Sequence, residues 1–300
     1  MLTKKIKLED IKSVLLNSNM MILDVNGIND EKILEREEGK IIIHFLKTVK
    51  QNFNEEDFTI LCNNFSNLNI IWEDNDNKKA GYYDSNQNSV VVLKDNYNEI
   101  YNAFFQAAST YVDFSNGNYT FSGFSQINNK NKKIGQGLNK GYTEYLSRKY
   151  FSNDESNNDF MYEVCVAKVV EDIIGEEIMQ SLYLNASLEG LMWEMGVDSD
   201  KTYEFLTSLD FISEELERKK VKPKAIESCS KAVNNFLIRL CVNKWMNEGL
   251  NDMAVHDRVL EELITLQPKA SENKRNIIST SIDNYIDLYN EDTYGAVKTK

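Results

Sequence analysis

The chain has 300 residues, of which 42% are hydrophobic and 27% charged, a composition typical of globular proteins that argues against long disordered stretches. Its formal net charge of −13 argues against a general nucleic-acid binder, because phosphate binding needs a concentrated Lys and Arg surface. The two basic runs, Lys130 to Lys133 and Arg218 to Lys224, lack interleaved aromatic residues that could stack on bases, so we interpret both as solvated charges.

The N-terminal part predicts a mixed arrangement of helices and strands. Apolar periodicity predicts helices over Leu8–Leu16, Asn29–Gln51 and Glu55–Phe65. Short uninterrupted apolar runs predict buried strands at Met20–Val25 and Asn69–Trp72.

A strand pair and a helix are predicted next. Tyr82–Leu93 predicts two strands that turn at Asp84–Asn88, a run rich in residues that tolerate turn geometry. The following run, Tyr97–Tyr111, has helical spacing and places Asn102 and Gln106 four residues apart on one side of the helix. Taken alone, this pair is better explained as an exposed polar strip on a packed helix.

The region after this helix is rich in Asn, Gly and Ser. Phe114–Gly137 predicts a loop or a hairpin around Tyr119–Ile127, and Leu138–Tyr150 predicts a second helix. Gly135 and Gly137 lie outside any strand-to-helix Gly-x-Gly-x-x-Gly context, so a phosphate loop is excluded.

The rest of the chain is predicted to be almost entirely helical, with no repeat of solenoid length. The predicted helices cover Met161–Ile174, Glu176–Leu184, Leu188–Met195, Lys201–Leu209, Ile212–Lys220, Ala225–Met246, Met253–Leu266 and Ser271–Tyr289.

The order of strand pair, helix and second helix between Gly81 and Phe151 resembles the catalytic core of the gluzincin metallopeptidases. The segment Gly-Leu-Asn-Lys-Gly-Tyr-Thr-Glu-Tyr at 137–145 is similar to the Leu-Asn-Glu-Gly-Phe-Ala-Glu-Tyr segment of aminopeptidase-type gluzincins. The resemblance implies a zincin-like fold. It also implies that the second arm of the Tyr82–Leu93 pair lines a substrate cleft with a free edge, which an extended peptide could join. A covered or solvated edge strand is the alternative.

Under this resemblance the residues of the metal site are replaced. Asn102, Ala103 and Gln106 align with the His, Glu and His of His-Glu-x-x-His, and Lys140 replaces the third ligand, a Glu. Amide oxygens are poor zinc ligands and an ammonium repels a dication. Ala103 cannot accept a proton from water. We therefore expect no catalytic zinc and no other cofactor.

Glu144 stands where gluzincins often keep an acid that orients a ligand histidine. Our hypothesis is that the Lys140 ammonium occupies the place of the missing zinc. It would there be bound by the carboxylate of Glu144 and by the amide oxygen of Asn102 or Gln106.

Few other residues offer chemistry. His44 and His256 are the only histidines, and a packed or solvated role is expected for each. The four cysteines are widely separated, which is typical of a reducing compartment. Without a visible signal peptide or an apolar run long enough to span a bilayer, we expect a cytoplasmic protein with no membrane contact.

We expect an α+β protein with a zincin-like part over 1–151, containing a small mixed sheet and an active-site-type helix, and a helical part over 152–300 packed against it. The expected function is that of a catalytically inactive, zincin-like protein that binds a protein or peptide partner. The alternatives are a metallopeptidase with an unconventional metal site that includes Glu144, and a helical interaction protein unrelated to peptidases.

Overall fold

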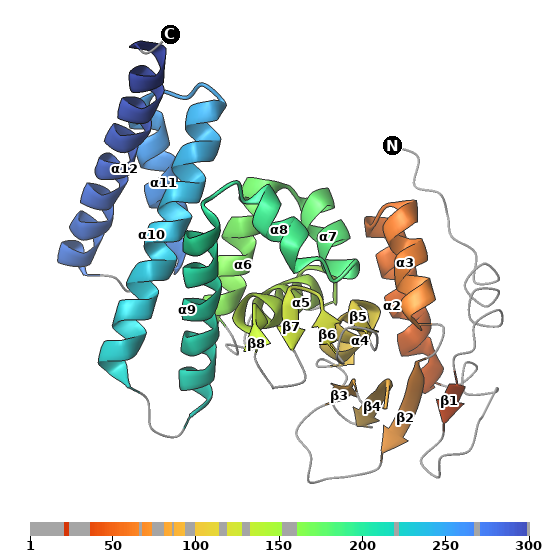
Figure 1. Ribbon diagram of the computed structural model, residues 1–300. Coiled ribbons are helices and arrows are strands. Elements are labelled where there is room, and N and C mark those ends of the chain that lie inside the picture. The colour runs from red at the N-terminus through yellow and green to blue at the C-terminus, as the bar shows by residue number, and fades with distance from the viewer. Residues whose placement is uncertain are drawn as a thin grey trace. The chain divides into compact units, whose positions relative to one another are not determined.

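The structure is a computed structural model, shown as a ribbon in Figure 1. It describes residues 21–23, 37–65, 68–73, 81–85, 87–93, 100–113, 119–127, 133–151, 161–218, 222–266 and 271–298. The predicted helix over Leu8–Leu16 lies outside these residues, as does the first part of the helix predicted from Asn29. The described chain is mostly helical with two small sheets, which is an α+β arrangement.

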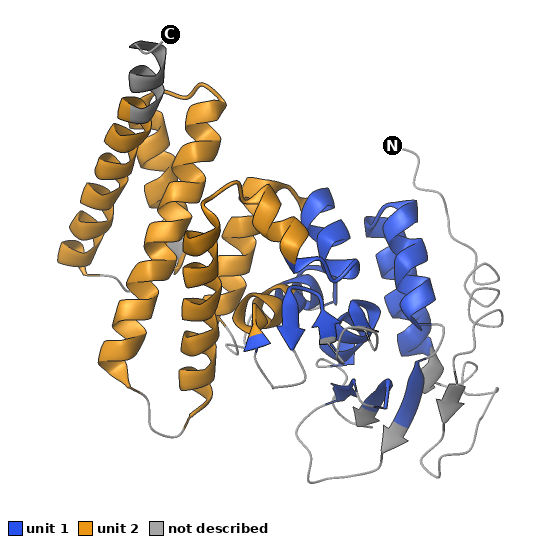
Figure 2. Ribbon diagram, viewed as in Figure 1, with its two compact units in different colours: residues 1–133, 143–158, 177–188 blue, residues 134–142, 159–176, 189–300 orange. Residues whose placement is uncertain are grey.

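The chain divides into two compact units whose segments alternate along the sequence (Figure 2). Unit 1 consists of Met1–Lys133, Thr143–Asn158 and Glu177–Leu188. Unit 2 consists of Ile134–Tyr142, Asp159–Glu176 and Glu189–Lys300. The sequence pattern predicts one boundary, after Phe151. The observed division instead splits helix α5 (Gln136–Phe151) after Tyr142 and assigns almost all of α7 (Glu176–Leu184) to unit 1.

The first sheet of unit 1 is mixed and has the strand order β1-β2-β4-β3. Strands β1 (Met21–Leu23), β2 (Asn69–Glu73) and β4 (Ser89–Leu93) are parallel, and β3 (Tyr82–Asp84) is antiparallel to β4. Runs such as Val90-Val91-Val92 suit a strand buried on both faces, which is the usual setting of parallel strands.

The predicted strand pair is confirmed, but the free edge expected on its second arm is wrong. Val90 of β4 lies opposite Ile70 of β2 on one side and opposite Tyr83 of β3 on the other. Because both edges of β4 are occupied, no peptide can join this strand by main-chain pairing.

Helix α4 (Ile100–Ala108) is shorter than the predicted helix over Tyr97–Tyr111. The hydroxyls of Ser109 and Thr110 donate to the carbonyls of Phe105 (2.9 Å) and Gln106 (2.6 Å), and such bonds satisfy carbonyls at a helix end. The chain then enters strand β5 (Thr110–Asp113), where β-branched and aromatic residues favour an extended backbone.

The second sheet has the order β5-β6-β7-β8 and includes the predicted hairpin. Strand β6 (Tyr119–Ser122) is antiparallel to both β5 and β7 (Ser125–Ile127). The short strand β8 (Lys133–Ile134) leads into α5.

The core of unit 1 is an aromatic cluster on α2 (Glu37–Asn52), α3 (Glu55–Phe65), α4 and the end of α5. At its centre is the fully buried Phe45. Its ring centroid lies 5.1 Å from that of Phe104 and 5.5 Å from that of Phe151. Large rings bury much apolar area in one place, so this cluster fixes α4 against α2 and α5.

Unit 2 is helical. Its helices are α6 (Met161–Ile174), α8 (Leu188–Glu194), α9 (Ser199–Glu217), α10 (Pro223–Asn247), α11 (Asp252–Leu266) and α12 (Glu272–Lys298).

Helix α9 corrects the prediction of two helices that meet between Leu209 and Ile212. Asp210 lies at this point, and a polar residue inside an apolar pattern resembles a break. In the structure its carboxylate accepts hydrogen bonds from the start of α5, so the helix continues through it. Helices α9 and α10 also pack together through the stacked rings of Phe205 and Phe236, whose centroids are 4.3 Å apart.

Candidate functional site

The segment that resembles gluzincins forms the first half of α5, and Asp210 of α9 caps it. The Asp210 carboxylate accepts the backbone N–H of Gly135 (2.8 Å) and of Gly137 (2.7 Å). Burial raises the pKa of Asp210 to about 6, the two backbone hydrogen bonds act against this shift, and Glu214 adds to it. A carboxylate at a helix N-terminus satisfies donors that the helix itself leaves open.

The two glycines of this segment are close-packing positions in unit 2. A Cβ on Gly137 would lie 2.8 Å from the carbonyl oxygen of Leu209 on α9. A Cβ on Gly141 would lie 2.2 Å from the carbonyl oxygen of Glu163 on α6. Glycine is therefore required at both positions by helix packing, which gives this part of the motif a structural explanation.

Lys140 forms an ion pair within unit 2. Its Nζ lies 2.5 Å from Oε1 of Glu217, near the end of α9. Asn102, Gln106 and Glu144 belong to unit 1. The hypothesis that Lys140 takes the place of a zinc ion stays a prediction.

Glu144 on α5 and Asn102 on α4 are in contact inside unit 1. The Glu144 side chain is 7% exposed, and its Oε2 accepts a hydrogen bond of 2.5 Å from Nδ2 of Asn102. Its Oε1 accepts one of 2.6 Å from Nε of Arg148, one turn along α5. Both carboxylate oxygens are thus engaged by donors, in a short, charge-assisted tie between two helices.

The remaining predicted positions are on α4. Ala103 is buried and Gln106 is partly buried. The Oδ1 atom of Asn102 is buried and accepts no hydrogen bond from the described residues. This leaves one polar acceptor beside the Asn102–Glu144 contact.

Each histidine contacts side chains of its own unit. His44 is exposed on α2, with its ring edge toward Phe151. His256 is partly buried, and its Nε2 is 2.8 Å from the hydroxyl of Ser279 on α12. Within the part of the chain that the structure describes, no group of three or more His, Cys, Asp or Glu side chains is arranged to hold a metal ion.

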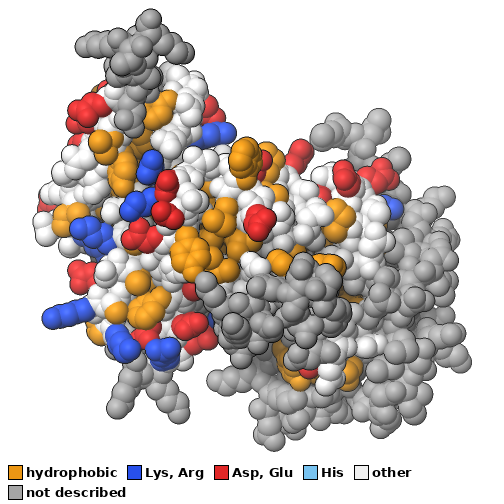
Figure 3. Space-filling view, in the orientation of Figure 1, with side chains coloured by type: hydrophobic (Ala, Val, Ile, Leu, Met, Phe, Trp, Pro, Cys, Tyr) orange, Lys and Arg blue, Asp and Glu red, His pale blue; other side chains and the backbone are white. Residues whose placement is uncertain are grey.

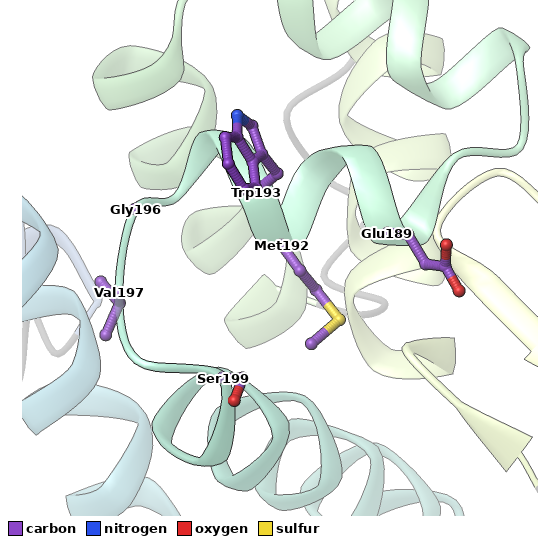
Figure 4. A pocket seen from close by; sticks show the side chains of 6 residues that line it. All are labelled: Glu189, Met192, Trp193, Gly196, Val197 and Ser199. Carbon is purple, nitrogen blue, oxygen red and sulfur yellow. The ribbon is translucent and has the colours of Figure 1, made fainter.

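A surface that the sequence analysis did not single out lies where α8 ends and α9 begins (Figure 4). It consists of Glu189, Met192, Trp193, Gly196, Val197 and Ser199, which line a pocket of about 470 Å³. We call it the Trp193 surface. Met192 extends from α8 on the side of Ser199, whereas Trp193 projects on the opposite side.

The exposure of Trp193 distinguishes this surface. Its side chain is 83% exposed, although tryptophan is usually well buried. No sequence pattern signals this exposure, because a tryptophan in an apolar helical run predicts a core residue. The turn at Gly196, with φ of +59°, ends α8 soon after Trp193.

The charges around the Trp193 surface are mostly negative. Between 189 and 201 there are four acidic residues and one basic residue, so the local formal charge is −3. The acidic residues, all exposed, are Glu189, Glu194, Asp198 and Asp200. The single base, Lys201, lies 3.2 Å from Glu204. A positively charged ligand is therefore attracted here.

No family model, no curated protein and no solved structure matches this chain. None of the helices in the described ranges is long and apolar enough to cross a membrane.

Proposed function

We propose that this chain is a catalytically inactive, zincin-like protein that acts by binding a basic segment of a partner protein at the Trp193 surface. The single observation that carries the binding role is the 83% exposed tryptophan beside an open pocket. Trp and Met are enriched at the centres of protein interfaces, and Trp supplies a large contact area at low entropic cost.

The charge of this surface supports a basic partner. Four exposed acids attract Lys and Arg side chains, and the face of an exposed indole binds such cations through its ring electrons. An apolar side chain of the partner would enter the pocket lined by Met192 and Val197. The proposed ligand is therefore a segment with an apolar residue flanked by basic ones.

The state of Glu144 supports the absence of peptidase chemistry in the gluzincin manner. A general base or a metal ligand must direct a carboxylate oxygen at the water or the metal, and the hydrogen bonds from Arg148 and Asn102, one to each oxygen, compete with that role. The Asn102–Glu144–Arg148 arrangement then serves as a helix-to-helix tie. The proposal also places the protein in the cytoplasm, in keeping with its four free cysteines.

A displayed library of random peptides, selected on the purified chain, tests the binding role. We expect the enriched peptides to combine an apolar residue with Lys or Arg. Their affinity should fall by about tenfold or more with Trp193→Ala, as for the loss of an interface hot spot, and should weaken with added salt.

Met253→Ala is the matched control, because Met253 is 74% exposed in the same unit but lies on α11. It should leave the affinity unchanged. Peptides that bind wild type and Trp193→Ala equally, or an enrichment of acidic peptides, would show that the proposed surface is wrong.

A further inference from the structure

A second concave site lies between helices α10 and α12 of unit 2. It shares no lining residue with the Trp193 surface. Its volume is about 1050 Å³, at the upper end of the range for small-molecule sites. The walls are the first four turns or so of α10 and the first turns of α12, which run in the same direction in Figure 1. We call it the α10–α12 groove.

The groove is basic although the chain is acidic. Its charged lining residues are Lys224, Lys231, Lys274 and Glu227, which give a local formal charge of three minus one, or +2. The whole chain has 47 acidic residues and 34 Lys and Arg residues. Basic residues therefore outnumber acidic ones in the groove, although the opposite holds for the chain. On the face of the molecule drawn in Figure 3, most of the visible, described Lys and Arg side chains belong to unit 2.

The three lysines are available to a ligand. All three are exposed, and their ammonium groups form no ion pair or hydrogen bond with the described residues. By contrast, Lys244 in the last turn of α10 lies 3.4 Å from Glu248. An unpaired ammonium at the rim of a concave site attracts an anion, and the N-terminus of α12 adds partial positive charge there.

Isoleucines supply the apolar part of the groove. Ile238 and Ile278 are buried in its floor, and Ile226 is partly buried. Ile277 is 55% exposed beside them, so apolar surface remains uncovered. A hydrocarbon chain lying along these residues would remove that surface from water.

The groove also contains a polar acceptor. The Oδ1 atom of Asn234 is buried and receives no hydrogen bond from the described residues. A hydroxyl group or a water molecule bound beneath a ligand would satisfy it.

From this combination we infer that the α10–α12 groove binds an anionic amphiphile, with one hydrocarbon chain on the isoleucines and a carboxylate among Lys224, Lys231 and Lys274. A purely polar anion would leave the isoleucines uncovered. A neutral apolar ligand would leave the lysines unused.

Isothermal titration of the purified chain with decanoate, below the concentration at which it forms micelles, tests this inference. We expect saturable binding of one decanoate per chain. Decyltrimethylammonium, which has the same tail and the opposite charge, should bind about tenfold more weakly or worse.

Variants locate the site. Replacing Lys224, Lys231 and Lys274 together by Gln should weaken decanoate binding about tenfold, the sum of three modest exposed ion pairs. Ile277→Ser should also weaken it, and because Ile277 is exposed this change leaves the fold intact. Lys244→Gln, on the same helix but outside the groove, should have no effect.

Three outcomes would overturn the inference: no saturable binding of decanoate, equal binding of the two amphiphiles, or unchanged binding by the triple lysine variant. Trp193→Ala should bind decanoate as wild type does. The result therefore does not depend on the Trp193 surface, and either proposal can fail without the other.

Discussion

Gly141 belongs to a recognisable sequence motif and is also required by helix packing. The segment around it resembles a peptidase signature, yet a Cβ at this position would lie 2.2 Å from the Glu163 carbonyl oxygen. Backbone atoms of a neighbouring helix cannot yield to such a contact without moving the helix. The glycine is therefore explained by the approach of α5 to α6, whatever chemistry the segment has.

Gly141→Ala is expected to destabilise the protein by about 1–3 kcal/mol, because the clash with α6 exceeds the gain of about 1 kcal/mol from replacing a helical glycine. Urea denaturation followed by circular dichroism measures this change. Lys140→Ala, next to it on α5, removes a partly exposed ion pair and should cost under about 1 kcal/mol. A Gly141→Ala variant as stable as wild type would refute the close approach.

At the scale of elements, α5 begins where Asp210 of α9 accepts the backbone N–H groups of Gly135 and Gly137. The cap joins two helices far apart in sequence, and it is made by a group whose pKa is raised to about 6 by burial. Ionisation of this carboxyl is thus opposed by the fold, although the ionised form accepts hydrogen bonds there.

The stability of the protein should therefore depend on pH through Asp210. The pKa of Asp210 is about 6 in the folded protein, above the ordinary 3.8. Its contribution to the free energy of unfolding is therefore full at low pH and is lost as the pH rises from about 4 to about 6. Asp210→Asn stays neutral throughout. Relative to this variant, the free energy of unfolding of the wild type should fall by up to about 3 kcal/mol over that range, because each pKa unit corresponds to about 1.36 kcal/mol.

Chemical denaturation of both proteins at a series of pH values gives this difference. Comparison with Asp210→Asn cancels other groups whose pKa is raised by burial, such as Asp57 and Glu262. A difference that stays constant between pH 4 and 7, or that grows in favour of wild type, would contradict the raised pKa.

The sequence predicts elements better than it predicts their partners. Helices such as α6 and α7 were predicted to the residue, because their apolar spacing is regular and glycine or polar residues mark their ends. The end of α4 and the continuity of α9 were missed, because side-chain hydrogen bonds decide both. The pairing of β4 on both edges depends on strands distant in sequence, which local patterns do not show.

The candidate site was predictable in part for the same reason. The resemblance singled out Asn102 and Glu144 as partners of Lys140, whereas the contact in the structure is a direct hydrogen bond from Asn102 to Glu144. The resemblance could not show that Arg148 engages the other carboxylate oxygen. The residue type of Trp193 alone suggests burial. Its exposure depends on where α8 ends and on what packs around that end, which local patterns do not show.

At the scale of the whole molecule, the charge of −13 is unevenly distributed. Unit 2 carries both an acidic surface around Trp193 and a basic groove between α10 and α12. Two surfaces of opposite charge on one unit suit a protein that binds two different ligands, and neither surface includes Asn102, Gln106, Lys140 or Glu144.

The metal content of the purified protein distinguishes an inactive, zinc-free protein from a metallopeptidase. Elemental analysis is made after purification without chelator and again after dialysis against zinc. We expect far less than one zinc per chain in both samples, because Asn102, Gln106 and Lys140 are poor ligands and Glu144 accepts hydrogen bonds from Asn102 and Arg148. One zinc per chain, lost with Glu144→Ala together with peptidase activity, would contradict this expectation.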